Sequence, residues 1–253
     1  MVHGLPAIKG VNKLCDGCLI GKQRCTPFPS QTSYRTDEPL ELVHGDICGP
    51  IKSTTPGGKT LFLLLVDDKR CFMWLILRQA KSEAEEAVKR IQARAEAECG
   101  KKMRVLHTDR GREFTSTSFG KYYDEFGIQR KLTVPYSLKQ NGVVERQNQT
   151  IVGTVRSLLM TVGIPGRFWG EAVMTAVYLL NWSPTRSLDG KMPYETWYNK
   201  KPMVHHFRVF CCVTYIKVAC LHLAKLDPRG LQVVFIGYEP GSKAYRLYDP
   251  ASG

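Results

Sequence analysis

The sequence predicts an α/β fold in which a mixed five-stranded sheet is flanked by helices. Three observations lead to this class. Several apolar runs have the length of strands, several longer segments have helical spacing or composition, and the two kinds alternate along the chain. Their order is strand, strand, strand, helix, strand, helix, strand, helix, helix, which is typical of a sheet with helices packed on it.

Three strands begin the predicted sheet. The segment LELVHGDICG, residues 40–49, predicts a strand that ends near Asp46. LFLLLVDD at 61–68 and CFMWLILR at 71–78 are apolar runs separated by charged residues. This pattern indicates a hairpin or two adjacent strands.

A helix and a further strand follow. Residues 81–100 are rich in Ala, Glu, Lys and Arg, and they predict a helix that Gly100 stops. The segment KKMRVLHTD, residues 101–109, predicts a strand that again ends in a carboxylate.

A short helix and a fifth strand come next. Residues 116–127 predict the helix, with Ser116 as its cap and Gly127 after its end. The segment IQRKLTVPY, residues 128–136, predicts a strand terminated by Pro135.

Two helices complete the predicted core. Apolar residues recur at helical spacing from about Val143 to Val162. Residues 164–184 predict a second helix, ended by Pro184.

The composition points to a polyanionic partner. Against 23 Asp and Glu stand 36 Lys and Arg, a net charge of +13, which favours nucleic acid first and an anionic membrane second. No apolar run approaches the roughly 18 residues that span a bilayer, and no secretory signal is recognisable. Nine cysteines, an odd number, indicate reduced thiols better than a disulfide framework. Both ends of the chain break off mid-pattern, so we expect a fragment of a longer protein.

Three carboxylates occupy comparable positions in this predicted fold. Asp46 and Asp109 stand at strand ends, and Glu145 lies in the first turns of the long helix. Strand ends on one side of a sheet converge, so the two aspartates are expected within a few ångströms of each other. Two bare carboxylates about 4 Å apart repel by roughly 4 kcal/mol at an effective dielectric near 20. Such a cluster persists only with a proton or a cation.

Hard divalent ions such as Mg²⁺ fit this ligand set, because they take oxygen ligands and leave positions open for substrate phosphates. Two such ions roughly 4 Å apart support an in-line phosphoryl transfer. The arginines beside Asp109, Arg110 and Arg112, then serve the phosphates of a nucleic acid. The alternative is that Asp109 pairs with an arginine or forms a turn, and that Glu145 lies on an exposed helix face.

Several motifs together resemble the integrases of copia-type LTR retrotransposons. They are HGDICGP, LLLVDD, VLHTDRGREF, GIQRKLTVPYSLKQNGVVERQNQT, FWGEAVMTAVYLLNWSP, PYETW and FIGYEPGSKAYRLYDP, in this order. Between Asp109 and Glu145 lie 35 residues, which is the spacing of the family's Asp-Asp-Glu triad. The likeness covers nearly the whole chain.

The resemblance implies an RNase H-like fold and a metal triad of Asp46, Asp109 and Glu145 that binds Mg²⁺ or Mn²⁺. It also implies two phosphoryl transfers: water trims the element's DNA ends, and the freed 3′-hydroxyl then attacks target DNA. The expected partners are DNA and further copies of the chain, with no membrane, and the expected location is the nucleus.

Residues around the start of the long helix are expected to meet DNA. Lys139 and Gln140 are candidates for contact with the element's DNA end, and Asn141 for the helix cap. Arg146 and Gln149 are expected to face DNA one helical turn apart. Phosphate contacts of this kind make binding sensitive to salt.

The resemblance also divides the chain into three parts. Residues 1–36 correspond to a partial pre-integrase segment and linker, 37–200 to the catalytic core, and 201–253 to a truncated region of the retroviral polymerase SH3-like type. In the first part CDGCLIGKQ resembles the end of a zinc-binding module. Cys15 and Cys18 have the spacing of half a zinc site. The family's two histidine ligands lie upstream, so the alternative is two cysteines without partners.

Some motifs depart from the family pattern. DRGREF replaces the more usual DRGGEF and puts Arg112 where glycine is normal, which predicts strain if a positive φ is needed. PYSLKQNG and VDDKRC also differ from the usual forms. These changes indicate either drift in an inactive copy that still binds nucleic acid, or tolerated variation. A generic RNase H-like ribonuclease is a third hypothesis.

Two histidines precede the aspartates. His44 and His107 each lie two residues before a triad acid, so strand alternation puts each on the same face as its aspartate. A packing or hydrogen-bonding role is favoured over a catalytic one.

Overall fold

The computed structural model describes residues 36–132, 142–217, 229–242 and 244–252. All of them belong to one compact unit, residues 35–253, and the chain's other unit, residues 1–34, lies outside the described residues.

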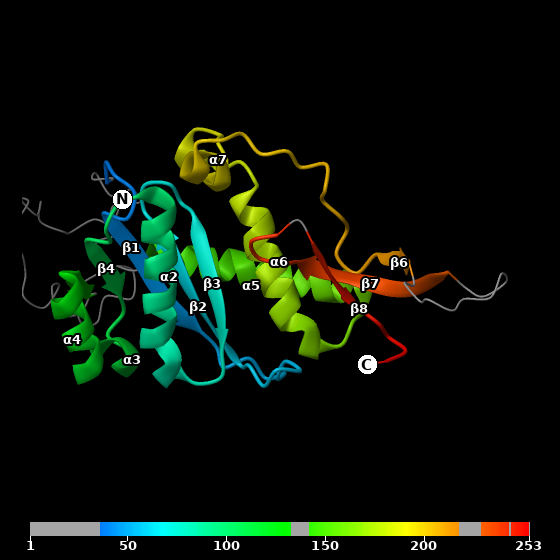
Figure 1. The fold of residues 1–253 in the computed structure, drawn as a ribbon. Coiled ribbons are helices and arrows are strands. Elements are labelled where there is room, and N and C mark those ends of the chain that lie inside the picture. Colours follow the sequence, from blue (N-terminus) through cyan, green and yellow to red (C-terminus); the bar gives the residue numbers. More distant parts are fainter. Residues whose placement is uncertain (1–35, 133–141, 218–228, 243, 253) are drawn as a thin grey trace, which may run out of the picture. The chain divides into compact units, whose positions relative to one another are not determined.

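A mixed five-stranded sheet is the central element, as predicted (Figure 1). The spatial order of its strands is β3-β2-β1-β4-β5. The β1–β2 and β2–β3 pairs are antiparallel, and the β1–β4 and β4–β5 pairs are parallel. The strands are β1 (Leu42–Cys48), β2 (Leu61–Asp67), β3 (Met73–Arg78), β4 (Val105–Thr108) and β5 (Gln129–Leu132).

Helices connect and follow these strands. They are α2 (Ala84–Cys99), α3 (Arg112–Thr115), α4 (Thr117–Phe126), α5 (Gly142–Val162), α6 (Trp169–Asn181) and α7 (Pro193–Tyr198), with short 3₁₀ turns η1 (Lys81–Glu83), η2 (Gly166–Phe168) and η3 (Arg186–Leu188). None of the helices among the described residues has the length and apolar character needed to cross a membrane.

The predicted end signals of two helices are confirmed. Gly100 follows α2 with a left-handed φ of 69°, and Gly127 follows α4 in the same conformation. At the start of α4, the Oγ of Ser116 accepts a hydrogen bond from the backbone N–H of Phe119 at 3.3 Å. Each device satisfies backbone groups that a helix end leaves unpaired.

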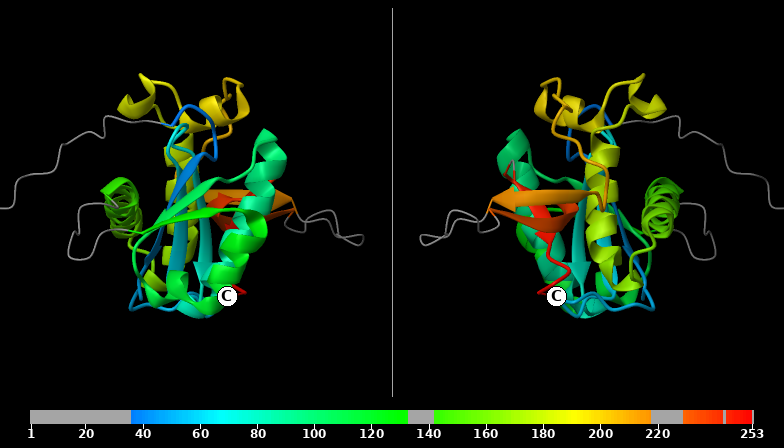
Figure 2. Two further views of the ribbon diagram at one scale, coloured as in Figure 1. Left: turned by 90° about the vertical axis from the view of Figure 1, so that its left-hand side faces the viewer. Right: turned by 90° about the vertical axis from the view of Figure 1, so that its right-hand side faces the viewer.

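Alternate residues of β2 fill two separate cores, which explains the continuous apolar run. Leu63 and Leu65 belong to the core that includes α2 and α4 residues. Phe62, Leu64 and Val66 belong to the core that includes α5 and α6 residues. Figure 2 shows α2 and α5 on opposite faces of the sheet. A strand buried on both faces reads as apolar throughout.

A second, three-stranded antiparallel sheet follows the core. It consists of β6 (Val213–Lys217), β7 (Gly230–Tyr238) and β8 (Tyr245–Tyr248), with β7 in the middle. It is held to α6 by Arg246, whose Nε and Nη2 each donate a hydrogen bond to the Glu171 carboxylate at 2.8 Å.

The structure corrects the end of one predicted strand and adds one short helix. Asp46 lies inside β1, two residues before the strand ends, because β1 pairs with β2 as far as Cys48. Helix α3 was not predicted, because its four residues are too few to show helical spacing. β5 ends at Leu132, and Pro135 lies outside the described residues.

Candidate active site

The pairing of β1 with β4 brings Asp46 and Asp109 to the same part of the sheet. In this parallel pair His44 lies opposite His107, and each aspartate follows its histidine by two residues. Neighbouring strands lie about 4.8 Å apart. Carried two residues further, the same register would place the two aspartates side by side, and Asp109 directly follows the end of β4 at Thr108.

Helix α5 adds the third acid. Asn148 donates a hydrogen bond from Nδ2 to the Asp46 Oδ2 at 2.6 Å, which fixes this helix against β1. Glu145 lies three residues earlier, on the same face of the helix. Burial raises the pKa of Asp46, and the charges of Asp109 and Glu145 raise it further against the opposing hydrogen bond from Asn148. The charges of the other two predicted acids thus both act on Asp46.

Asp109 also shapes the turn after β4. Its Oδ1 accepts a hydrogen bond from the backbone N–H of Gly111 at 3.0 Å. Arg112 then begins α3 with helical backbone and is absent from the residues with positive φ. The strain considered for Arg112 is therefore not found, and the turn-forming role of Asp109 coexists with its position beside Asp46.

Two family models and several known proteins match this chain. Residues 36–137 match the integrase core domain, and residues 212–253 match the retroviral polymerase SH3-like domain. The Pol polyprotein of the Nicotiana tabacum transposon TNT 1-94 is 39% identical over 94% of this chain. The chain belongs to the retrotransposon integrases. The resemblance to the copia-type family is confirmed.

Other relatives extend this assignment. The Pol polyprotein of transposon RE1 from Arabidopsis thaliana is 30% identical over 91% of the chain. The integrase chain spans only 18% of the TNT 1-94 polyprotein and 16% of the RE1 polyprotein.

A solved structure supports the fold. The simian T-cell lymphotropic virus intasome in complex with the PP2A regulatory subunit B56 gamma has a TM-score of 0.58 at 16% identity. The match covers 93% of this chain and 84% of that chain. The predicted RNase H-like fold of the integrase core is confirmed.

The acids of the integrase core have the chemistry of a Mg²⁺ site but not its closed geometry. Mutual repulsion at Asp46 and the oxygen-only donor set both fit a hard divalent cation. Within the part of the chain that is described, however, no three His, Cys, Asp or Glu side chains are arranged to hold one ion. Asp46 and Asp109 each give one carboxylate oxygen to a hydrogen bond.

Two of the predicted DNA-facing residues can be located. Arg146 and Gln149 are both exposed on α5, three residues apart, and Arg146 Nη1 would lie 3.3 Å from a Cβ placed on Gly142. The other candidates lie outside the described residues. These are Lys139, Gln140 and Asn141, together with the two zinc candidates Cys15 and Cys18.

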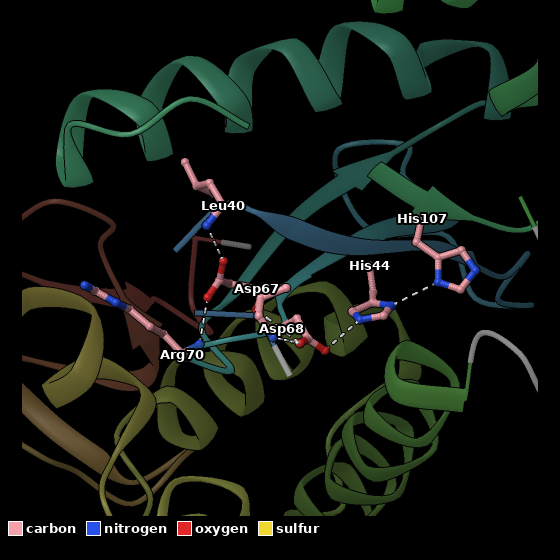
Figure 3. Close-up of polar contacts among 7 residues, drawn as sticks. Leu40, His44, Asp67, Asp68, Arg70 and His107 are labelled. Atoms are coloured by element: carbon pink, nitrogen blue, oxygen red, sulfur yellow. Dashed lines mark hydrogen bonds and ion pairs between the residues drawn. The ribbon is translucent and has the colours of Figure 1, made fainter. Parts of the chain in front are cut away.

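The two histidines form a buried chain of contacts that ends at Asp68 (Figure 3). The Nδ1 atoms of His44 and His107 are 3.3 Å apart, so one ring donates to the other. His44 Nε2 lies 3.0 Å from Asp68 Oδ1. Burial lowers the pKa of His107 to about 4, helped by the charges of His44 and Lys131. The favoured hydrogen-bonding role of the pair is confirmed.

Sequence reasoning missed two residues at this site. Asn148 holds Asp46, and its spacing of three residues from Glu145 on a helix was the signal that it shares the acid's face. Lys81 lies in η1, which follows β3, and the charges of Asp109 and Asp46 act on it. No local pattern connects Lys81 to either acid.

Proposed function

We propose that this integrase core catalyses DNA 3′-end processing and strand transfer with Mg²⁺ or Mn²⁺. The observation that supports this is that the charges of Asp109 and Glu145 both raise the pKa of Asp46. Carboxylates drawn together from two strands and a helix, against their own repulsion, are expected where a cation is needed.

Each residue has a defined task in the proposed mechanism. The three acids would hold the metal, which when bound supplies activation of the attacking oxygen and neutralisation of charge on the phosphate. Asn148 keeps the Asp46 carboxylate oriented through its hydrogen bond. Water or the DNA 3′-hydroxyl attacks the phosphodiester directly, so no nucleophilic side chain is required.

DNA is the proposed partner. In strand transfer, the end of the element's DNA and the target DNA must both bind beside the three acids. Arg146, which directly follows Glu145 on α5, is exposed and is proposed to bind backbone phosphate. We further propose that several copies of the chain assemble on paired DNA ends and act in the nucleus.

Replacing Asp109 with Asn tests the proposed catalysis. The variant removes the charge but keeps an oxygen that accepts the Gly111 N–H, so the turn should be retained. We expect strand transfer with Mg²⁺ or Mn²⁺ to fall at least about 100-fold, the order of loss seen when a transition-state-stabilising group is removed. The assay joins oligonucleotides carrying the element's terminal repeats to target DNA.

An exposed aspartate supplies the control. Asp124, near the end of α4, is exposed, and Asp124→Asn should leave strand transfer unchanged. Both variants should keep the circular dichroism of the parent chain. Undiminished strand transfer in Asp109→Asn would remove this residue from the mechanism.

A further inference from the structure

Lys81 occupies a position between two acidic sites. It begins the 3₁₀ turn η1 ahead of α2, and its Nζ lies 2.9 Å from Glu113 Oε1. The Lys81 side chain is 53% exposed, whereas that of Glu113 is 8% exposed. The lysine can therefore leave this ion pair for solvent or a ligand, while the glutamate stays in place.

The catalytic acids also act on Lys81. Its pKa is raised, first by the hydrogen bond to Glu113 and then by the charges of Glu113, Asp109 and Asp46. The ammonium group is thus charged at neutral pH, and Arg110 and Gly111, which directly follow Asp109, line the same surface as Lys81.

An open surface depression adjoins this lysine. Among its lining residues are three cations, Lys81, Arg110 and Arg112, and three hydroxyl side chains, Ser82, Ser116 and Ser118. Cations and hydroxyls are the side chains that bind DNA backbone phosphates. Arg112 is exposed and makes no ion pair with any residue that the structure describes.

Glu113 lies inside this basic surface because Gly111 leaves room for it. A Cβ on Gly111 would lie 2.6 Å from the Glu113 Cδ, so the carboxylate folds over the glycine backbone. Glu85, the other carboxylate of the depression, pairs with Lys89 at 2.7 Å. Glu113 is therefore the acid that holds Lys81 when no phosphate is present.

We propose that Lys81 is a phosphate-positioning residue of the integrase reaction. Its ammonium group dissociates from Glu113 and binds a DNA backbone phosphate next to the reacting ester. The inference rests on the proposed function. Because the Lys81 end of the ion pair is exposed, its ammonium group can turn from Glu113 to a phosphate in the depression, where Arg112 adds a second positive charge. Lys81 thereby orients a DNA strand toward Asp109 without touching the metal ligands.

Three substitutions test this role in the full 253-residue chain. Lys81→Ala should lower the strand-transfer rate at least about tenfold and reduce the slope of log affinity against log salt by about one. Lys81→Arg keeps the charge and should restore both. Glu113→Gln frees the lysine and should tighten DNA binding with the salt slope retained. Affinity is measured by fluorescence anisotropy on a duplex with the element's end and on an unrelated duplex, between about 50 and 200 mM salt.

Lys101 provides the matched control. It is 48% exposed and pairs with Glu38 at 3.0 Å, but it follows the far end of α2, whose 16 residues span about 24 Å. Lys101→Ala should change neither rate nor salt slope.

The two reaction steps show which DNA supplies the phosphate. Loss of both end processing and strand transfer in Lys81→Ala assigns it to the element's end, and loss of strand transfer alone assigns it to the target. An unchanged salt slope, or a Lys81→Arg variant as impaired as Lys81→Ala, would overturn the proposal. The binding measurement decides this even if the parent chain joins no DNA, a result that would count against the proposed function alone.

Discussion

Asp67 and Asp68 follow each other in the chain, but the fold shifts their pKa values in opposite directions. Asp67 is fully buried, and burial raises its pKa to about 6 although it accepts hydrogen bonds from the backbone N–H groups of Leu40 and Arg70, each at 2.7 Å. Burial alone would also raise the pKa of Asp68, but the hydrogen bond and charge of His44 hold it below its usual value. Figure 3 shows the two carboxylates facing these different partners.

Asp67 should therefore make the unfolding free energy fall as the pH rises. Its folded pKa of about 6 exceeds the ordinary value of 3.8, so its contribution is complete below about pH 4 and is lost as the pH rises through about 6. The difference between these two pKa values corresponds to about 3 kcal/mol of unfolding free energy. His107 acts oppositely in this window, since its pKa of about 4 lies below the ordinary 6.5 and its contribution is lost as the pH falls.

The Asp67→Asn variant separates these two effects. It removes the titration of Asp67 and leaves that of His107, so the parent chain should gain stability relative to the variant as the pH falls from about 7.5 to about 4.5. Urea unfolding at several pH values measures this difference. Parallel curves for the two proteins would show that Asp67 does not titrate in this range.

Regular elements could be predicted from the sequence because each carries its own periodic signal. The long helix α5 was expected from about Val143 to Val162 and spans Gly142–Val162. The four residues of α3 are too few for periodicity, and the turn at Asp109 depends on a side chain that also belongs to the site. The contact between Asn148 and Asp46 joins residues 102 positions apart, so local patterns could supply the residue types but not the pairing.

Helix α4 permits a test of its predicted signals with two glycines. Gly120 lies within the helix, and a Cβ there would meet nothing within 4 Å, so Gly120→Ala should stabilise the chain by about 0.5 to 1 kcal/mol. Gly127 has a φ of 63°, so Gly127→Ala should destabilise it by about 1 to 2 kcal/mol. Urea unfolding measures both. A shift of the same sign in both variants would contradict the helix end assigned to Gly127.

The integrase core and the SH3-like sheet are connected through α6. Thr175 of α6 donates a hydrogen bond to the carbonyl of Ile236 in β7 at 3.4 Å, and the two domains share the aromatic stack of Tyr178 on Tyr238, whose ring centroids are 4.2 Å apart. Because α6 also packs against β2 and β3 of the core, the second sheet is expected to unfold with the core unless these contacts are weakened.

The Arg246–Glu171 pair is the strongest polar contact in this connection, since the guanidinium donates two hydrogen bonds to one carboxylate. Such bidentate pairs are stronger than single ones, and a double-mutant cycle with Glu171→Gln and Arg246→Met should give a coupling of about 1 kcal/mol. In the Glu171→Gln variant, amide exchange should become faster in β7 and β8 and stay unchanged in β2. Glu239 is the matched control: it accepts from Arg246 at 3.1 Å but does not belong to α6, so Glu239→Gln should affect exchange in β7 less. Equal acceleration in β2 would mean that the pair stabilises the whole unit and not the connection between its two sheets.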